Sequence, residues 1–311
     1  MSVFIADLVL SYGLTTAVSV LGILGNLTTM LVMSRAGLRD VFNVTITSLA
    51  VCDFFFLVTL IFRRMVHIMK LQGGMLGITL AAYSRAYGSA VSDLFAVLAI
   101  MHVYFISVER FCAVFFPFKI SRVFTVNRIR IYLTLLYVLF SFCFVPRYLL
   151  EIVVWETDTS SNTSMPIVRF NDLFLYDEKV QYYTLAVYFT LVISGDFFVT
   201  FSSVSISLRM LSISRKRMEM NVGTNTSLRT GKTFVGICIV HMIVQVPYYV
   251  GTVIVTILPE DFLNSETHSF LYNCIHLLSS LKSSLNFIVY IFLAPKFRPE
   301  LKSLLSCHKK T

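Results

Sequence analysis

Charged residues are scarce in this chain of 311 residues. Asp, Glu, Lys and Arg make up only 14% of it, whereas apolar residues make up 56%. The mean hydropathy of +0.77 is too high for the surface of a soluble domain of this size. Internal repeats, metal-ligand spacings and HExxH or Ser–His patterns are absent from the sequence. The composition therefore indicates a membrane protein, and no motif supports an enzyme, a cofactor or a bound metal.

Seven apolar stretches are each long enough to cross a bilayer as a helix, which takes about 20 residues. A β-barrel would instead show shorter, alternating segments. The first stretch is too long for the core of a signal peptide and lacks a basic leader, so we expect it to stay as a helix. We predict an all-α membrane protein, a single seven-transmembrane domain over residues 1–311, with helices near 8–34, 42–69, 81–115, 129–154, 180–208, 231–258 and 268–294.

The distribution of Lys and Arg predicts the orientation of the bundle. Basic residues concentrate in the connections that follow the first, third and fifth helices and in the C-terminal tail, whereas acids concentrate in the other connections. The positive-inside rule then places the N-terminus outside the cell. The net charge of +9 is explained by this topology and by contact with anionic lipid, not by nucleic acid. Asn162, in an outer loop, is the expected glycosylation site.

Short motifs occur in a definite order along these helices. They are Gly25-Asn26, Leu49-Ala50-Val51-Cys52-Asp53, Glu109-Arg110-Phe111, Pro117, Pro247 and Asn286-Phe287-Ile288-Val289-Tyr290. In this order the chain resembles the rhodopsin-like (class A) G-protein-coupled receptors over essentially its whole length, in a divergent form similar to invertebrate peptide or chemosensory receptors. The resemblance also implies a short amphipathic juxtamembrane helix near 296–306.

The resemblance implies an activation switch and a surface for a heterotrimeric G-protein. The switch residues would be Asp53, Glu109, Arg110, Gln245, Pro247, Lys282, Asn286 and Tyr290. The G-protein contacts would be Arg110, Ala113, Pro117 and Phe118. A buried arginine needs an anionic partner, and Glu109 can supply one in a resting state. The alternative is an interfacial ion pair with a snorkelling arginine and no switching role.

Several residues depart from the family pattern. Arg85 stands where the family places its helix-three cysteine, and the outer loop has no cysteine, so we expect no extracellular disulfide. The six cysteines are most simply core residues, although Cys307 beside basic residues is a candidate for S-acylation. Helix six has Gln245 in place of the usual tryptophan.

Lys282 stands where the family has an asparagine near a sodium site. An ammonium group in hydrocarbon needs a carboxylate, and Asp53 lies at a similar predicted depth. We therefore hypothesise that a Lys282–Asp53 ion pair replaces the sodium ion. The alternative is that Lys282 snorkels or lines a water-filled cavity.

Charged and polar residues on the outer halves of the helices define a candidate ligand pocket. They are Arg63, Arg64, His67, Ser92, Asp93, Ala96, Arg147 and Gln245. Charges at this depth are expensive and should face the interior of the bundle. The arginines suit a ligand with an anionic group. Internal pairing is the alternative, either between Arg64 and Asp93 or between Arg147 and Glu151 four residues later.

We therefore expect a plasma-membrane receptor that couples an extracellular ligand, a peptide or a chemosensory small molecule, to a heterotrimeric G-protein. A seven-helix transporter or ligand-gated channel without G-protein coupling is the alternative. Transporters often show inverted repeats and broken helices, which the sequence lacks. Asp53 and Asp93 lie on different helices at different predicted depths, so a catalytic carboxylate pair is not expected.

Overall fold

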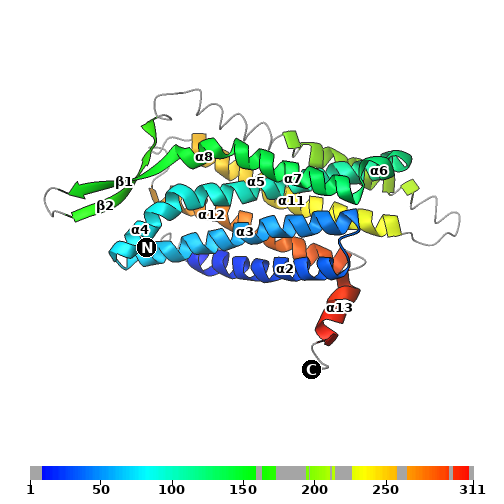
Figure 1. Cartoon of the computed structure of the whole chain (residues 1–311), viewed down its shortest axis with the longest axis horizontal. Coiled ribbons are helices and arrows are strands. Elements are labelled where there is room, and N and C mark those ends of the chain that lie inside the picture. Colours follow the sequence, from blue (N-terminus) through cyan, green and yellow to red (C-terminus); the bar gives the residue numbers. More distant parts are fainter. Residues whose placement is uncertain are drawn as a thin grey trace.

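A computed structural model describes residues 9–158, 163–172, 194–195, 197–210, 212–213, 226–257, 265–293 and 297–307. Long helices run side by side along one axis, with a β-hairpin at one end of the molecule and the C-terminal helix at the other (Figure 1). The predicted helical membrane bundle is confirmed. Among the described residues five helical segments are long and apolar enough to cross a membrane. Two shorter apolar stretches are also helical, namely Phe197–Met210 and Cys238–Thr252, and the second lies within a longer helix, Thr226–Ile257.

The first span combines a short π-helical segment η1 (Val9–Leu14) with α2 (Thr15–Arg35), and the second is α3 (Val41–Leu71). Gly37 has a φ of +94° in the turn between α2 and α3, a conformation that suits glycine. Asp40 then caps α3, because its carboxylate accepts a hydrogen bond from the backbone N–H of Phe42 at 3.3 Å.

The third span is continuous from Met75 to Phe115 and contains α4 (Met75–Tyr83), the π-helical η2 (Ser84–Gly88) and α5 (Ser89–Phe115). A short helix α6 (Pro117–Val123) follows with proline at its start, where the missing N–H costs nothing. The fourth span consists of α7 (Val126–Cys143) and α8 (Val145–Leu150). The remaining long helices are α11 (Thr226–Ile257) and α12 (Ser265–Leu293), and α13 (Phe297–Cys307) turns away from the bundle (Figure 1).

The end of the fourth span differs from the sequence prediction. Residues 151–154 were expected to be helical, but Glu151 begins strand β1 (Glu151–Asp158), which pairs antiparallel with β2 (Thr163–Phe170). The β-branched residues Ile152, Val153 and Val154 favour this extended form, and their apolar character is what made the segment resemble the end of a span. The predicted fifth helix, near 180–208, lies mostly outside the described residues.

Helix α2 packs closely against α12. A Cβ atom at Gly22 would lie 2.1 Å from the Oγ atom of Ser284, so only glycine fits at this approach. Four residues later, the Asn26 amide donates to the Ser283 carbonyl at 3.0 Å. These contacts hold the first and last spans together and set the depth of α12 in the bundle.

A buried polar cluster joins α3, α5 and α7. His102, which is fully buried, contacts the Ser48 hydroxyl through Nε2 at 2.7 Å and the Leu98 carbonyl through Nδ1 at 2.7 Å. The Tyr137 hydroxyl lies 3.0 Å from Ser48 Oγ and 3.0 Å from Cys52 Sγ. Buried polar groups are costly unless they are hydrogen-bonded, so this cluster fixes how the three helices pack.

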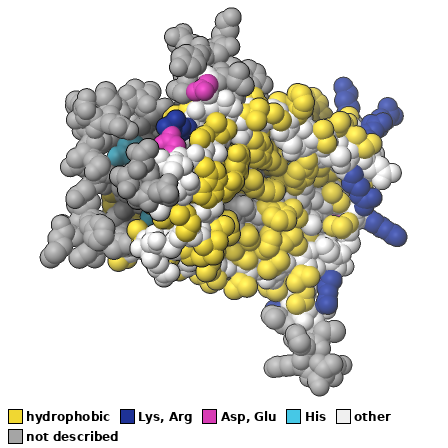
Figure 2. All heavy atoms as spheres, turned by 60° about the vertical axis from the view of Figure 1, so that its left-hand side comes forward, with side chains coloured by type: hydrophobic (Ala, Val, Ile, Leu, Met, Phe, Trp, Pro, Cys, Tyr) yellow, Lys and Arg dark blue, Asp and Glu magenta, His cyan; other side chains and the backbone are white. Residues whose placement is uncertain are grey.

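The outer surface of the bundle is apolar. Figure 2 shows hydrophobic side chains across the face that is turned to the viewer, with Lys and Arg side chains projecting from one end. Large apolar side chains that would be unusual on the surface of a soluble protein are exposed on several helices, among them Leu21, Phe142 and Phe292, which are 69%, 76% and 67% exposed. Such a band matches the hydrocarbon region of a bilayer.

Candidate functional site

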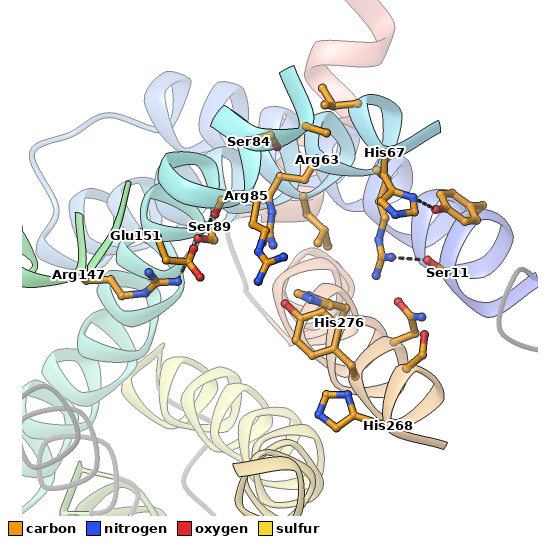
Figure 3. Close-up of a pocket in the computed structure, with 18 residues that line it drawn as sticks. Ser11, Arg63, His67, Ser84, Arg85, Ser89, Arg147, Glu151, His268 and His276 are labelled. Carbon is orange, nitrogen blue, oxygen red and sulfur yellow. Dashed lines mark hydrogen bonds between the residues drawn. The ribbon is translucent and has the colours of Figure 1, made fainter. Parts of the chain in front are cut away.

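A cavity of about 610 Å³ opens at the end of the bundle that carries the hairpin (Figure 3). Its lining comes from η1, α3, α4, η2, α5, α8, β1 and α12, so residues far apart in the sequence meet there. The lining side chains are mostly polar or basic. Four are arginines, namely Arg63, Arg64, Arg85 and Arg147, three are histidines, namely His67, His268 and His276, and one is an acid, Glu151.

Arg64 and His67 are anchored to the first span. The Arg64 guanidinium donates to the Ser11 hydroxyl and lies 6.0 Å from the centre of the Tyr12 ring. The Tyr12 hydroxyl is hydrogen-bonded to Nδ1 of His67. These contacts fix one wall of the cavity and hold the Arg64 side chain in one position.

Arg147 is anchored on the opposite wall, at the hairpin end of the fourth span. Its Nε lies 3.1 Å from the Asp93 carboxylate, and its Nη2 donates to Ser89 Oγ at 3.0 Å. The two internal pairings considered as alternatives are therefore wrong, because Asp93 pairs with Arg147 and not with Arg64. Glu151 is a strand residue, so it does not follow Arg147 along a helix face.

Four of the predicted pocket residues line this cavity, namely Arg63, Arg64, His67 and Arg147. Four others do not, namely Ser92, Asp93, Ala96 and Gln245. Asp93 forms an ion pair with Arg147 but does not itself line the cavity. Gln245 accepts a hydrogen bond from Lys282. The sequence prediction missed the contribution of α12, whose residues Ser269, Tyr272, Asn273 and His276 form one polar face at helical spacing. That spacing is visible in the sequence and would have identified this wall.

Polar residues in the interior of the bundle connect α3, α11 and α12. The Asn286 amide donates to Asp53 Oδ2 at 2.9 Å, and Lys282 Nζ donates to Gln245 Oε1 at 3.2 Å. The hypothesis of a Lys282–Asp53 ion pair stays a prediction, because these hydrogen bonds join Lys282 to Gln245 and Asp53 to Asn286. Tyr290 is fully buried, with its ring centre 6.1 Å from that of Phe297 at the start of α13.

The other end of the bundle carries the Glu109–Arg110 pair. Arg110 Nε lies 2.7 Å from the Glu109 carboxylate, and the guanidinium lies 5.3 Å from the centre of the Phe42 ring. The side chains of Glu109 and Arg110 are only 10% and 15% exposed. Of the other predicted G-protein contacts, Phe118 on α6 is 92% exposed and Pro117 is also exposed, whereas Ala113 is half-buried.

Two predicted modification sites are not described. Asn162 lies outside the described residues. Cys307 ends α13, but its side chain lies outside the described part of the structure. Cys52, Cys112, Cys143, Cys238 and Cys274 are free thiols. Within the described residues no group of His, Cys, Asp and Glu is arranged to hold a metal ion.

Comparison with known proteins agrees with this architecture. Residues 25–290 match the family described as 7 transmembrane receptor (rhodopsin family), so the chain belongs to that family of receptors. It is thus a multi-pass membrane receptor of a non-enzymatic family. Among curated proteins it is similar to the FMRFamide receptor of Drosophila melanogaster, with 25% identity over 295 residues. The alignment covers 92% of this chain and 52% of the relative, so the chain spans about half the length of the curated relative that it matches.

Proposed function

We propose that this protein is a plasma-membrane receptor with its N-terminus outside, which binds an extracellular ligand carrying an anionic group and activates a heterotrimeric G-protein. The observation that carries the ligand class is the cavity, where the described lining residues include four arginines and one acid. Guanidinium groups bind carboxylates and phosphates through paired N–H donors, and the walls already hold Arg64 and Arg147 in place.

The orientation is supported by where the charges lie. The cavity occupies the hairpin end of the bundle, and basic residues such as Arg122, Arg128 and Arg130 are exposed near α6, at the opposite end. Basic residues prefer the cytoplasmic side of a membrane. The cavity would then face the outside, where a ligand arrives, and Arg110 would face the cytoplasm.

Signal transfer would depend on α3, α5 and α12, which line the cavity and also carry the deeper switch residues. A ligand that contacts Arg63 on α3 and His276 on α12 would change the relative positions of these helices. Such a shift would change the geometry of the Asp53–Asn286 hydrogen bond in the middle of the bundle. It would also change that of the Glu109–Arg110 ion pair at the inner end. Opening that pair would free Arg110, with Ala113, Pro117 and Phe118, for contact with the G-protein.

The relative's name makes a peptide one ligand class to examine. The tetrapeptide amide FMRFamide and the same tetrapeptide with a free C-terminal carboxylate form a matched pair that differs in one negative charge. If the basic cavity selects an anion, the free acid should be preferred over the amide. Small anionic odorants represent the alternative class, a chemosensory ligand.

The test is G-protein activation in cells that express the wild type or Arg110→Ala, against these peptides and odorants. A ligand-dependent response that disappears in the variant, with surface expression unchanged, is the expected result. Ionic current or ligand uptake that is independent of G-protein and unaffected by Arg110→Ala would contradict the proposal and favour a channel or transporter.

A further inference from the structure

The two remaining arginines of the cavity differ from the two that form its walls. Arg64 and Arg147 have hydrogen-bond partners, as described above. Arg63 and Arg85, in contrast, make no ion pair and no side-chain hydrogen bond with the other residues that the structure describes. Arg63 comes from α3 and Arg85 from η2, and both side chains extend into the cavity (Figure 3).

The charge of the described residues that line the cavity is unbalanced. Among the described residues that line it, four guanidinium groups face one carboxylate, that of Glu151, which leaves an excess of three positive charges. Asp93 pairs with Arg147 from outside the lining and lowers the excess to two. The histidines do not offset it, because an imidazole is either neutral or positive. Like charges that share a partly enclosed cavity repel one another more strongly than they would in water.

A ligand with a single negative charge would leave part of this excess uncompensated. An oxyanion with two or more negative charges, such as a phosphate group or a pair of nearby carboxylates, would neutralise it. Such a group also offers enough acceptor oxygens to engage two guanidinium forks at once. The aliphatic part of Arg63 lies near Gly88, where an added Cβ would be 3.6 Å from Arg63 Cγ.

We propose that the ligand of this cavity carries a multiply charged oxyanion, and that Arg63 and Arg85 together form the subsite that binds it. This inference rests on the proposed function, since it specifies the ligand of the same cavity. It assigns distinct roles to the arginines: Arg64 and Arg147 shape the walls, and Arg63 and Arg85 determine the charge of the ligand that is accepted.

The test uses thermal unfolding of the purified full-length receptor in detergent, with inorganic pyrophosphate, succinate and acetate as probes at equal ionic strength. At about ten times its dissociation constant, a probe that binds the folded state should raise the Tm by roughly 2–4 °C. We expect such a rise with pyrophosphate or succinate and none with acetate. A rise with pyrophosphate alone would indicate a phosphate ligand, and a rise with succinate alone a dicarboxylate.

Three variants locate the effect. Arg85→Gln, at an exposed position, should fold normally and lose most of the rise in Tm, and Arg63→Lys should reduce it because a lysine lacks the planar fork. The matched control is Arg169→Gln, which removes the same charge from the hairpin outside the cavity and should keep the full rise. Equal rises with acetate, pyrophosphate and succinate, or an equal loss of the rise in the control variant, would overturn the inference.

This measurement needs no G-protein, so it separates the two proposals. A rise in Tm with pyrophosphate or succinate but not with acetate, without any signalling, would retain the subsite and contradict the proposed function. A G-protein response to a ligand with a single carboxylate, with no rise in Tm from pyrophosphate or succinate, would retain the proposed function and overturn the subsite.

Discussion

Asn286 on α12 donates a hydrogen bond to the fully buried Asp53 on α3 at 2.9 Å, and one helical turn from Asn286 the ammonium of Lys282 donates to Gln245. A carboxylate and an ammonium thus lie in the same region of the interior, where each is expensive to bury alone. This arrangement links α3, α11 and α12 at the depth where the family resemblance implies a switch.

A double-mutant cycle measures the dependence of Lys282 on Asp53. Asp53→Asn should lower the free energy of unfolding by about 1–3 kcal/mol, because it leaves the ammonium without its nearby carboxylate. Adding Lys282→Met should recover much of this loss. The readout is thermal unfolding of the purified protein. Lys302→Met on the exposed α13 is the control, and its effect should simply add to that of Asp53→Asn. Additivity for Lys282 as well would refute the paired-charge hypothesis.

The sequence predicted those parts of the site that depend on neighbours along the chain or on one helix face. Glu109 and Arg110 are adjacent, so their pairing needed no tertiary information. The equal spacing of Lys282, Asn286 and Tyr290 predicts one face of α12, because residues four apart lie together on a helix.

Other features depend on contacts that periodicity does not encode. The partner of Arg147 is Asp93, 54 residues away, and not Glu151, because the chain leaves the helix at Leu150 and pairs as a hairpin. The three-helix contact of His102 likewise involves Ser48 and Tyr137, whose spacing in the sequence carries no signal. A short apolar segment such as 151–154 suits either a helix end or a strand, and only its pairing with β2 decides between them.

The Glu109–Arg110 pair provides a prediction about basal signalling. Glu109→Gln removes the carboxylate that holds Arg110 while keeping the shape of the side chain. If the pair stabilises the resting state by about 1–2 kcal/mol, the active fraction should rise roughly 5- to 30-fold while it remains small. The measurement is nucleotide exchange on a G-protein without added ligand. Lys119→Gln, at an exposed position of α6, is the control for a change of charge at the same end of the protein. An unchanged basal rate in Glu109→Gln would show that the pair is structural only.

The buried cluster around His102 provides a prediction about stability. His102→Ala should lower the free energy of unfolding by about 2–4 kcal/mol, because it leaves a cavity and removes the partner of Ser48. Tyr137→Phe should cost about 0.5–1.5 kcal/mol, since only the hydroxyl is lost. Tyr132→Phe on the same helix is the control, because the Tyr132 hydroxyl makes no hydrogen bond within the described residues. A His102→Ala protein as stable as the wild type would show that the cluster does not hold α3, α5 and α7 together.

The Arg147–Asp93 pair connects the end of the fourth span to α5. Asp93 is 47% exposed and Arg147 20% exposed, so solvent weakens the attraction, and we expect a coupling of about 0.5–1 kcal/mol in a cycle of Asp93→Asn and Arg147→Gln. The Arg169–Glu156 pair within the hairpin is the control, because its arginine is 59% exposed, compared with 20% for Arg147, and its coupling should be smaller. Unfolding in urea measures both cycles.

Proteolysis of the hairpin should also become faster in Asp93→Asn, because β1 follows directly from the helix that Arg147 holds in place. A coupling near zero together with unchanged proteolysis would mean that the hairpin is positioned by its apolar contacts alone.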